Sequence, residues 1–165
     1  MKIIQDLDSF AGKSKKRKII TILSNPCFHA VFLYRISSFC YKLHLSPIAK
    51  IIWYVNRIIF NVDIDYRAKL AGGFTIKHGF GLVIGKNVVS KGALTVYQGV
   101  TLGGDRKKTR NIGGVLIDQP IIGENIVIYV DAKVFGPVVV GDGVIIKSGT
   151  IVTKDIYVTV RNNHG

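Results

Sequence analysis

The second half of the chain carries an aliphatic residue at every sixth position. Six consecutive steps give Ile122, Ile128, Val134, Val140, Ile146 and Val152. Two earlier runs keep the same step, one with a single polar member, and they read Ile64, Leu70, Ile76 and Ile84, Ser90, Val96, Leu102. A helix would repeat every 3.6 residues and a half-buried antiparallel strand every two. A step of six therefore predicts a solenoid of short parallel strands.

The six-residue step is interrupted twice. The first interruption falls at His78, and the second lies between Leu102 and Ile122. The second contains GGDRKKTRNIGG, residues 103–114, which has four basic residues and Ile112 as its single aliphatic one. We predict a protruding loop near 104–113 that is either a solvated basic surface or a substrate-facing element.

Residues 1–62 have a different pattern from the rest of the chain. Bulky apolar residues recur there three and four positions apart, as in amphipathic helices. We therefore predict an N-terminal helical region over 1–62, a mainly β solenoid over 63–157 and a C-terminal tail over 158–165. Within the most hydrophobic span, 45–62, polar and charged residues such as Lys50 interrupt the apolar run, so we expect an amphipathic helix and not a transmembrane one.

The charge is strongly one-sided, with 23 Lys and Arg against 10 Asp and Glu. This balance favours an anionic partner. The basic run at 13–18 has no nucleic-acid-binding motif beside it, so we expect no nucleic acid partner. Cys27 and Cys40 suit reduced thiols in a cytoplasmic protein, and the scattered histidines and cysteines predict no metal site.

Two motifs carry a resemblance to a known family. The segments VDIDYRAKLAGGFTIKHGFGLVIGKNVV and VYQGVTLGGDR, together with the six-residue repeats, resemble the hexapeptide-repeat acyltransferases, specifically their serine acetyltransferase branch. In character the chain is similar to the capsular and exopolysaccharide O-acetyltransferases of that group. The resemblance covers about residues 25–156. It implies a left-handed parallel β-helix with three hexads per turn, a homotrimer with active sites between subunits, and acetyl-CoA as the acyl donor.

The resemblance places the catalytic histidine at His78 and its orienting carboxylate at Asp63. A turn of three hexads has eighteen residues, so two residues fifteen apart lie on neighbouring turns, about one strand spacing of ~4.8 Å apart plus a short lateral offset. The imidazole would remove the proton of an acceptor hydroxyl as it attacks the thioester. Asp65 competes for the orienting role, and the alternative for His78 is a structural histidine at a coil corner.

The resemblance also implies residues for the cofactor. Gly103, Gly104 and Gly136 would let the pantetheine arm lie against the backbone, or they simply turn a corner. Lys154 is the first candidate for a CoA phosphate contact and Lys147 the second, although a lone lysine on a solenoid is more often solvated.

The sequence departs from the family at the acceptor positions. Serine acetyltransferases have an aspartate before the catalytic histidine and a histidine in the loop after LGG, whereas this chain has Lys77 and Lys107 there. Together with Arg106, these lysines predict an anionic acceptor. We therefore expect acetylation of an anionic or lipid-linked sugar or glycan in surface polysaccharide biosynthesis. The alternative is serine O-acetylation in cysteine biosynthesis, and a minor alternative is a non-catalytic trimeric scaffold or a basic membrane-binding protein.

The helical region has two competing interpretations. Residues 13–18 and an amphipathic helix that buries Ile51, Trp53 and Phe60 in lipid would hold the protein at the inner face of the cytoplasmic membrane. Equally, the same apolar residues would cap the open end of the solenoid and never contact lipid.

Overall fold

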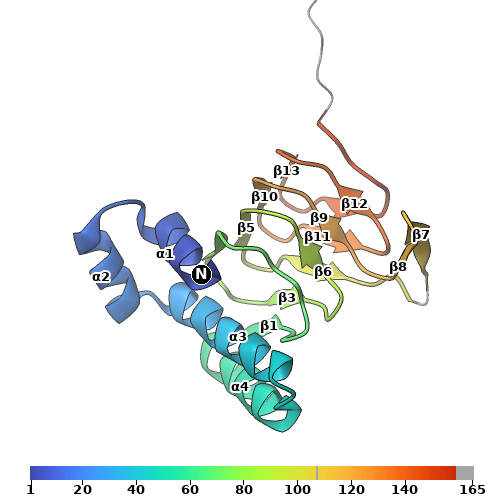
Figure 1. The fold of residues 1–165 in the computed structure, drawn as a ribbon. Coiled ribbons are helices and arrows are strands. Elements are labelled where there is room, and N and C mark those ends of the chain that lie inside the picture. The colour runs from blue at the N-terminus through green and yellow to red at the C-terminus, as the bar shows by residue number, and fades with distance from the viewer. Residues whose placement is uncertain (107, 159–165) are drawn as a thin grey trace, which may run out of the picture.

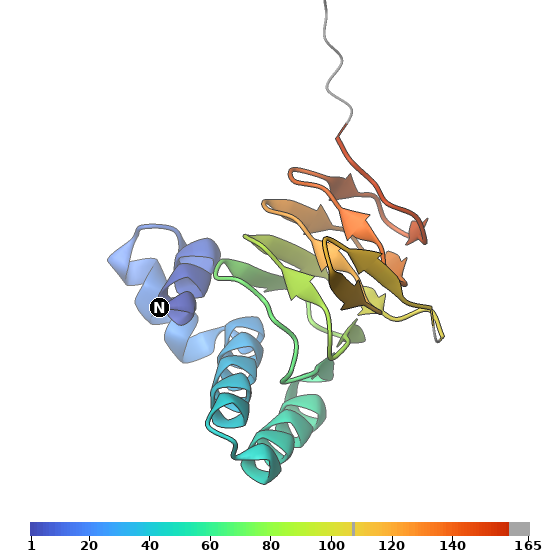
Figure 2. The ribbon, with the colours of Figure 1, turned by 45° about the vertical axis from the view of Figure 1, so that its right-hand side comes forward.

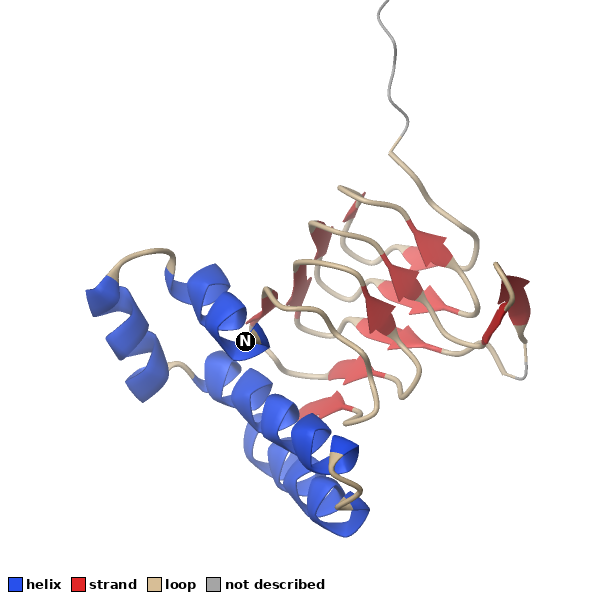
Figure 3. Cartoon of the chain, viewed as in Figure 1, coloured by secondary structure: helices blue, strands red, loops and turns tan. Residues whose placement is uncertain are grey.

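The computed structural model describes residues 1–106 and 108–158, which form a group of helices followed by a coil of short strands (Figures 1 and 3). Most of the predicted C-terminal tail, and Lys107, lie outside the described residues. The helices are α1 (Lys2–Ala11), α2 (Lys15–Ser24), α3 (Pro26–Lys42) and α4 (Ser46–Phe60). Asn25 separates α2 from α3 because its side chain caps α3, where its Oδ1 accepts from the Phe28 N–H at 3.1 Å.

The strands form a parallel β-helix with three faces. The first face has five strands, β1 (Val62–Ile64), β3 (Leu82–Ile84), β6 (Thr101–Gly103), β11 (Lys133–Phe135) and β14 (Ile151–Val152). The second has three, β4 (Val89–Ser90), β9 (Ile121–Ile122) and β12 (Val139–Val140). The third has four, β2 (Phe74–Lys77), β5 (Leu94–Tyr97), β10 (Ile126–Ile128) and β13 (Ile145–Ile146). The chain visits the first, second and third faces in turn on each coil.

The six-residue repeat marks the inside of this coil. Regular coils advance by eighteen residues, as where Lys133 pairs with Ile151. All the predicted aliphatic positions are at most 6% exposed, which confirms the solenoid. Ser90, the polar exception, is also buried, because its Oγ accepts from the Ala71 N–H at 2.9 Å. An inward polar side chain is tolerated where a backbone group satisfies it.

The first interruption of the repeat is a longer corner. Asp63 pairs with Val83, twenty residues along the chain, where the next coil advances by eighteen. The two additional residues fall between Ile76 and Ile84, in the corner that begins with His78. The irregularity in the sequence therefore corresponds to a local change in the path of the backbone.

The second interruption contains a hairpin, where the sequence had predicted a loop. Strands β7 (Arg110–Ile112) and β8 (Val115–Ile117) pair in antiparallel fashion and project from the corner after β6 (Figure 1). Arg110 ties the hairpin to the last coil, because its Nη1 donates to both oxygens of Asp155 at 2.7 and 2.8 Å.

The helices close one end of the β-helix. Helix α3 contacts β2 and α4 contacts β1, the two strands at the start of the coil (Figure 2). Tyr34 lies in the core of the first coil, and its hydroxyl donates to the Ala68 carbonyl at 2.7 Å. The capping interpretation of the helical region is therefore correct for the side of these helices that faces the coil.

No helix in the described part of the chain is by itself long and apolar enough to cross a membrane. The pair α2 and α3 satisfies the length and composition criteria only when the two are taken together, and they are bent by 78° at Asn25.

Candidate active site

His78 lies in the longer corner that follows β2. Its φ angle is 61°, in the left-handed region that side-chain-bearing residues rarely occupy. Such strained backbone positions collect at functional sites, where the surrounding structure holds them. The imidazole is exposed. A strained corner thus presents the predicted catalytic side chain to solvent.

A cleft of about 390 Å³ lies in front of this corner. It separates the end of β2 from the junction of α2 and α3, and its lining residues are Phe10, Ile20, Thr21, Ser24, Asn25, Pro26, Cys27, Ile76, Lys77 and His78. The helix break at Asn25 and Pro26 creates the wall opposite His78. The polar residues from α2 and this junction were not identified from the sequence, because only the folded chain brings them to β2.

Asp63 lies on β1 and is held by residues of α4. Its Oδ1 accepts from the Trp53 indole N–H at 2.9 Å, and its Oδ2 lies 3.7 Å from Nη2 of Arg57. Among the described residues, no hydrogen bond joins Asp63 to His78.

The His78 corner nevertheless passes beside the start of β1. The Gly81 N–H donates to the Asn61 carbonyl at 3.1 Å, and Val62, next in the chain, pairs with Leu82. The corner and the segment that leads to Asp63 are therefore neighbours. This agrees with the fifteen-residue spacing of Asp63 and His78, which predicted that they lie on neighbouring turns.

Asp65, the competing carboxylate, has a local partner. Its two oxygens accept from Nε and Nη2 of Arg67 at 2.8 and 2.6 Å, and its Oδ1 also accepts from the Arg67 backbone N–H. The hydrogen bonds from Arg67 to this carboxylate raise the pKa of the guanidinium above its ordinary value. Both Asp65 oxygens are thus occupied by Arg67. This favours Asp63 as the carboxylate that would orient His78.

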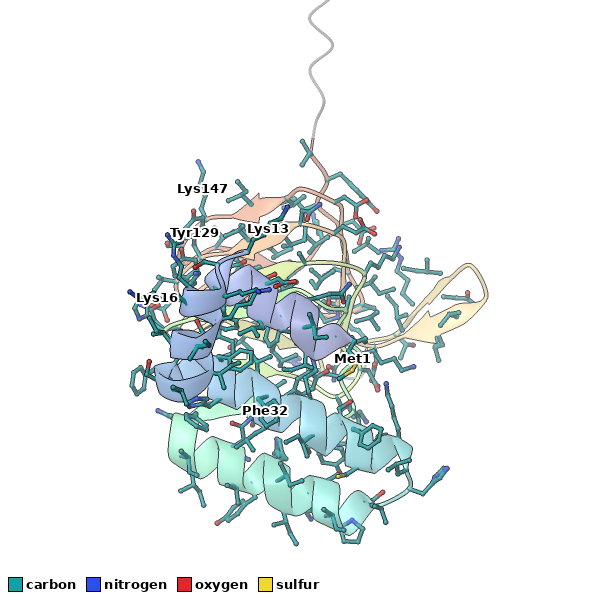
Figure 4. All side chains as sticks on the ribbon, turned by 60° about the vertical axis from the view of Figure 1, so that its left-hand side comes forward. Met1, Lys13, Lys16, Phe32, Tyr129 and Lys147 are labelled. Carbon is teal, nitrogen blue, oxygen red and sulfur yellow. The ribbon has the colours of Figure 1, made fainter. Side chains whose placement is uncertain are left out.

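Four outward-facing side chains follow one another along the His78 corner. Each comes directly after a buried hexad residue, and together they form what we call the corner column, Lys77, Tyr97, Tyr129 and Lys147. Lys77 pairs with Tyr97 in the sheet, and the Tyr97 and Tyr129 rings stack with centroids 4.9 Å apart. Tyr129 and Lys147 lie on the same side of the molecule in Figure 4.

The tyrosines of the corner column were missed in the sequence, although the six-residue repeat contained the signal. Tyr97 follows Val96 and Tyr129 follows Ile128, just as Lys77 follows Ile76. Positions directly after inward residues point outward in a strand, so the repeat could have identified the column.

Gln98 follows Tyr97 at the same corner. Its Oε1 is buried and has no hydrogen-bond partner in the described structure. A buried acceptor without a donor costs about 1–3 kcal/mol. Among the described residues no donor offsets this cost.

The remaining predicted residues gather at a different corner, beneath the hairpin. A hollow of about 420 Å³ is lined there by Asp105, Lys108, Arg110, Phe135, Gly136, Pro137, Val138, Thr153, Lys154 and Asp155. The Gly136 N–H donates to the Gly103 carbonyl at 2.9 Å, and Gly136 has a φ of 92° that suits glycine. A Cβ at Gly104 would crowd the Asp118 carbonyl, and Arg106 lies exposed on the loop.

Asp155 is a residue of this hollow whose pKa is shifted by its surroundings. Burial, the largest influence, raises the pKa of its carboxyl, but hydrogen bonds from Arg110 and the Val139 N–H outweigh it and leave the pKa below the ordinary value. The carboxylate is therefore held in its charged form by Arg110 of the hairpin and the Val139 N–H of the coil.

The two sets of predicted residues are separated within one protomer. His78, Lys77 and Lys147 lie where the third face turns into the first, whereas Gly103 and Lys154 lie where the first face turns into the second. A site that used both sets would need a second copy of the chain. Among the described residues no group of three or more potential metal ligands occurs, and both cysteines are free.

No family model matches the chain, but individual proteins do. A serine acetyltransferase of Bacillus pumilus is 36% identical over 154 residues, which cover 92% of this chain and 68% of that protein. One from Helicobacter pylori is 33% identical over 142 residues, covering 86% and 79%. One from Synechococcus elongatus is 32% identical over 135 residues, covering 82% of this chain and 53% of that protein. The chain thus spans about half the length of the last relative.

The fold is also similar to solved structures. The crystal structure of a serine acetyltransferase from Brucella abortus has a TM-score of 0.81 and 26% identity, and the match covers 93% of this chain and 61% of that one. A serine acetyltransferase in complex with cysteine has a TM-score of 0.82 and 25% identity, covering 93% and 62%. This likeness confirms the predicted left-handed β-helix with an N-terminal helical region.

Proposed function

This chain belongs to the serine acetyltransferase family, and from that premise we propose that it transfers an acetyl group from acetyl-CoA to a hydroxyl group of an acceptor. The observation that carries the proposal is the position of His78. The resemblance puts this residue at the family's catalytic position, and it lies on a left-handed corner and lines a cleft large enough for a small acceptor.

In the proposed reaction His78 acts as the general base. Its ring nitrogen accepts the proton of the acceptor hydroxyl as that oxygen bonds to the thioester carbon. When the tetrahedral intermediate collapses, the carbon–sulfur bond breaks and His78 returns the proton to the leaving sulfur. Asp63 orients the ring and stabilises its positive charge, and Trp53 and Arg57 hold the Asp63 carboxylate in place.

Serine is the acceptor favoured by the comparisons, because the relatives reported above are named serine acetyltransferases. They lend no support to the sugar acceptor that the sequence predicted. One observation keeps an anionic acceptor as a second candidate. Lys77 lines the cleft beside His78, and an ammonium group there would repel the amino group of serine and attract an acid.

We further propose that the working unit is a homotrimer. The hollow lined by Gly136 and Lys154, with Gly103 hydrogen-bonded to Gly136, suits the pantetheine arm and a phosphate of acetyl-CoA, but in one protomer it lies at a different corner from His78. A neighbouring copy would supply the missing half of each site. Lys147 fits this arrangement less simply, because it is on the His78 corner. We place this activity in the cytoplasm.

The test is release of CoA thiol from acetyl-CoA with serine, with anionic sugars, and with no acceptor. We expect His78→Ala to lower turnover by about 10²–10⁴-fold and Asp63→Asn to leave a larger residual rate. His44→Ala is a matched control, since His44 is also exposed and also has a φ of 61°, but is in the turn between α3 and α4.

Two outcomes decide between the proposals. Wild-type turnover in His78→Ala would show that the catalytic assignment is wrong. A serine efficiency of about 10⁴ M⁻¹s⁻¹ or more would establish serine as the acceptor and exclude the sugar. Poor use of serine, together with improvement in Lys77→Asp, would instead show that Lys77 selects an anionic acceptor.

A further inference from the structure

Helix α4 exposes an apolar face to solvent. Its members recur three and four residues apart and are each 37–66% exposed, and we call them the α4 stripe, Ile48, Ile51, Tyr54, Val55, Ile58 and Ile59. In a helix this spacing places all six on one side. Only Ala49 and Asn56 of α4 are buried. The stripe is therefore a continuous apolar surface that none of the described residues covers.

The orientation of α4 is fixed by its opposite side. The Asn56 Nδ2 donates to the Ala30 carbonyl of α3 at 3.1 Å, Trp53 donates to Asp63, and Phe60 packs against the core. The helix cannot rotate its stripe inward without breaking these contacts. This corrects part of the sequence interpretation, because Trp53 and Phe60 face the protein and only Ile51 of the three predicted lipid contacts faces out.

The segment that carries the stripe is basic. Residues 9–62 contain no Asp or Glu and nine basic residues, Lys13, Lys15, Lys16, Arg17, Lys18, Arg35, Lys42, Lys50 and Arg57. Lys50 and Arg57 are both exposed and lie two helical turns apart, along one edge of the stripe. Arg57 also lies 3.7 Å from the Asp63 carboxylate, whereas Lys50 has no ion pair among the described residues. An apolar surface with exposed cations along one edge complements an anionic surface that has an apolar layer beneath it.

We propose that the α4 stripe binds the surface of an anionic membrane. The helix would lie in the plane of the interface, with the stripe among the upper acyl chains and Lys50 at the phosphates. At fifteen residues α4 is too short to span the bilayer, which needs about 20. This surface is separate from the His78 cleft, and the proposal does not depend on the acetyl transfer proposed above.

A second copy of the chain is a poorer occupant of the stripe. A two-fold contact would place α4 against α4 and bring Lys50 and Arg57 toward the same residues of the partner. Helix α4 carries no acid that could offset this repulsion, and Asp63, which follows it, already pairs with Arg57 of its own chain.

The experiment is flotation of the protein with vesicles of phosphatidylcholine alone and of phosphatidylcholine with phosphatidylglycerol, at low and high salt. We expect binding only to the vesicles with phosphatidylglycerol, and weaker binding at high salt. The double variant Ile51→Gln with Ile58→Gln should weaken binding by about tenfold or more. The matched control is Val115→Gln with Leu116→Gln on the hairpin, which removes two equally exposed apolar side chains and should leave binding unchanged.

Circular dichroism should confirm that each variant is folded, and Ile48→Gln with Ile59→Gln provides a second test of the stripe if the first variant is not. The proposal is overturned if the unaltered protein does not float with anionic vesicles at low salt, or if neither stripe variant weakens the binding. It is also overturned if light scattering shows that stripe variants dissociate an oligomer while the unaltered protein binds no vesicle, because the stripe would then be an interface between copies.

Discussion

The β-helix and the helical region achieve their stability in different ways. In the β-helix every inward hexad position except that of Ser90 buries an aliphatic residue, so the core is continuous from Ile64 to Val152. The helices bury far less apolar surface, and α4 leaves most of its apolar residues outside. The repeat therefore supplies its own core, whereas the helices added at its end depend on specific contacts with it.

Those contacts include a buried ion pair that joins α1, α3 and the first coil. Asp6 is fully buried and accepts from Nε and Nη2 of Arg35 at 2.8 and 3.0 Å. It also accepts from the Phe74 N–H at 2.9 Å, and Arg35 donates to the Leu70 carbonyl at 2.8 Å. Breaking one partner of such a pair leaves an uncompensated buried charge.

The largest expected effect on stability follows from removal of the Arg35 guanidinium. Arg35→Met should lower the free energy of unfolding by about 3–5 kcal/mol, because Asp6 would stay buried without its cation. Urea unfolding measures the change. Asp6→Asn combined with Arg35→Met is the control, and it should recover much of the loss because no charge remains. Equal instability of the single and double variants would show that the charge is not what joins the helices to the coil.

The next largest effect on stability is expected from truncation of a buried residue of the repeat. Ile128→Ala should cost about 2–5 kcal/mol, because it opens a cavity in a core where the side chain is fully buried. Val127→Ala, one position away, points outward and should cost less than half as much in the same urea measurement. If the two costs were equal, the outer face of β10 would have to be as well packed as the inside.

A smaller effect is expected from the hydroxyl that links α3 to the coil. Tyr34→Phe leaves the Ala68 carbonyl without its 2.7 Å donor and should cost about 1–2 kcal/mol. Burial raises the pKa of Tyr34, so its contribution is present below about pH 10 and is lost as the pH rises through the raised value. Unfolding free energies measured at increasing alkaline pH should fall less steeply in Tyr34→Phe. The same slope in both proteins would rule out Tyr34 as the source.

The smallest effect concerns the hairpin. The lowered pKa of Asp155 means that its stabilising contribution is present above about pH 4 and is lost as the pH falls through the lowered value. Asp155→Asn should therefore increase hydrogen exchange in β7 and β8 at neutral pH with little change in global stability. Asp142→Asn serves as a control, since Asp142 instead accepts from the Glu124 N–H. Unchanged exchange in Asp155→Asn would mean that the tie to Arg110 does not hold the hairpin.

Much of the fold could be predicted from the sequence because each inward position of the repeat is marked by one aliphatic residue. The hexad positions gave the inward face, and both interruptions were located correctly at His78 and before Ile122. The hairpin in the second interruption was not foreseen, because four basic residues and paired glycines do not distinguish an ordered β-hairpin from a loop.

Only some residues of the candidate site could be predicted from the sequence in this way. His78 and Lys77 are adjacent in the chain and share the cleft, but Thr21, Ser24 and Asn25 reach that cleft through the docking of α2 and α3. The corner column was hidden for a different reason. Its four residues are 18 to 32 positions apart, and the hairpin insertion between coils obscures their common register.

The sequence by itself determined the coil, because burial at a fixed period of six acts locally and repeats along the chain. It also determined the interruption of the repeat at His78 and the absence of acid between residues 9 and 62. Only the tertiary structure decided which side of α4 faces the coil, since both sides are apolar. The choice depends on where Trp53 and Asn56 find hydrogen-bond partners, which no local pattern specifies.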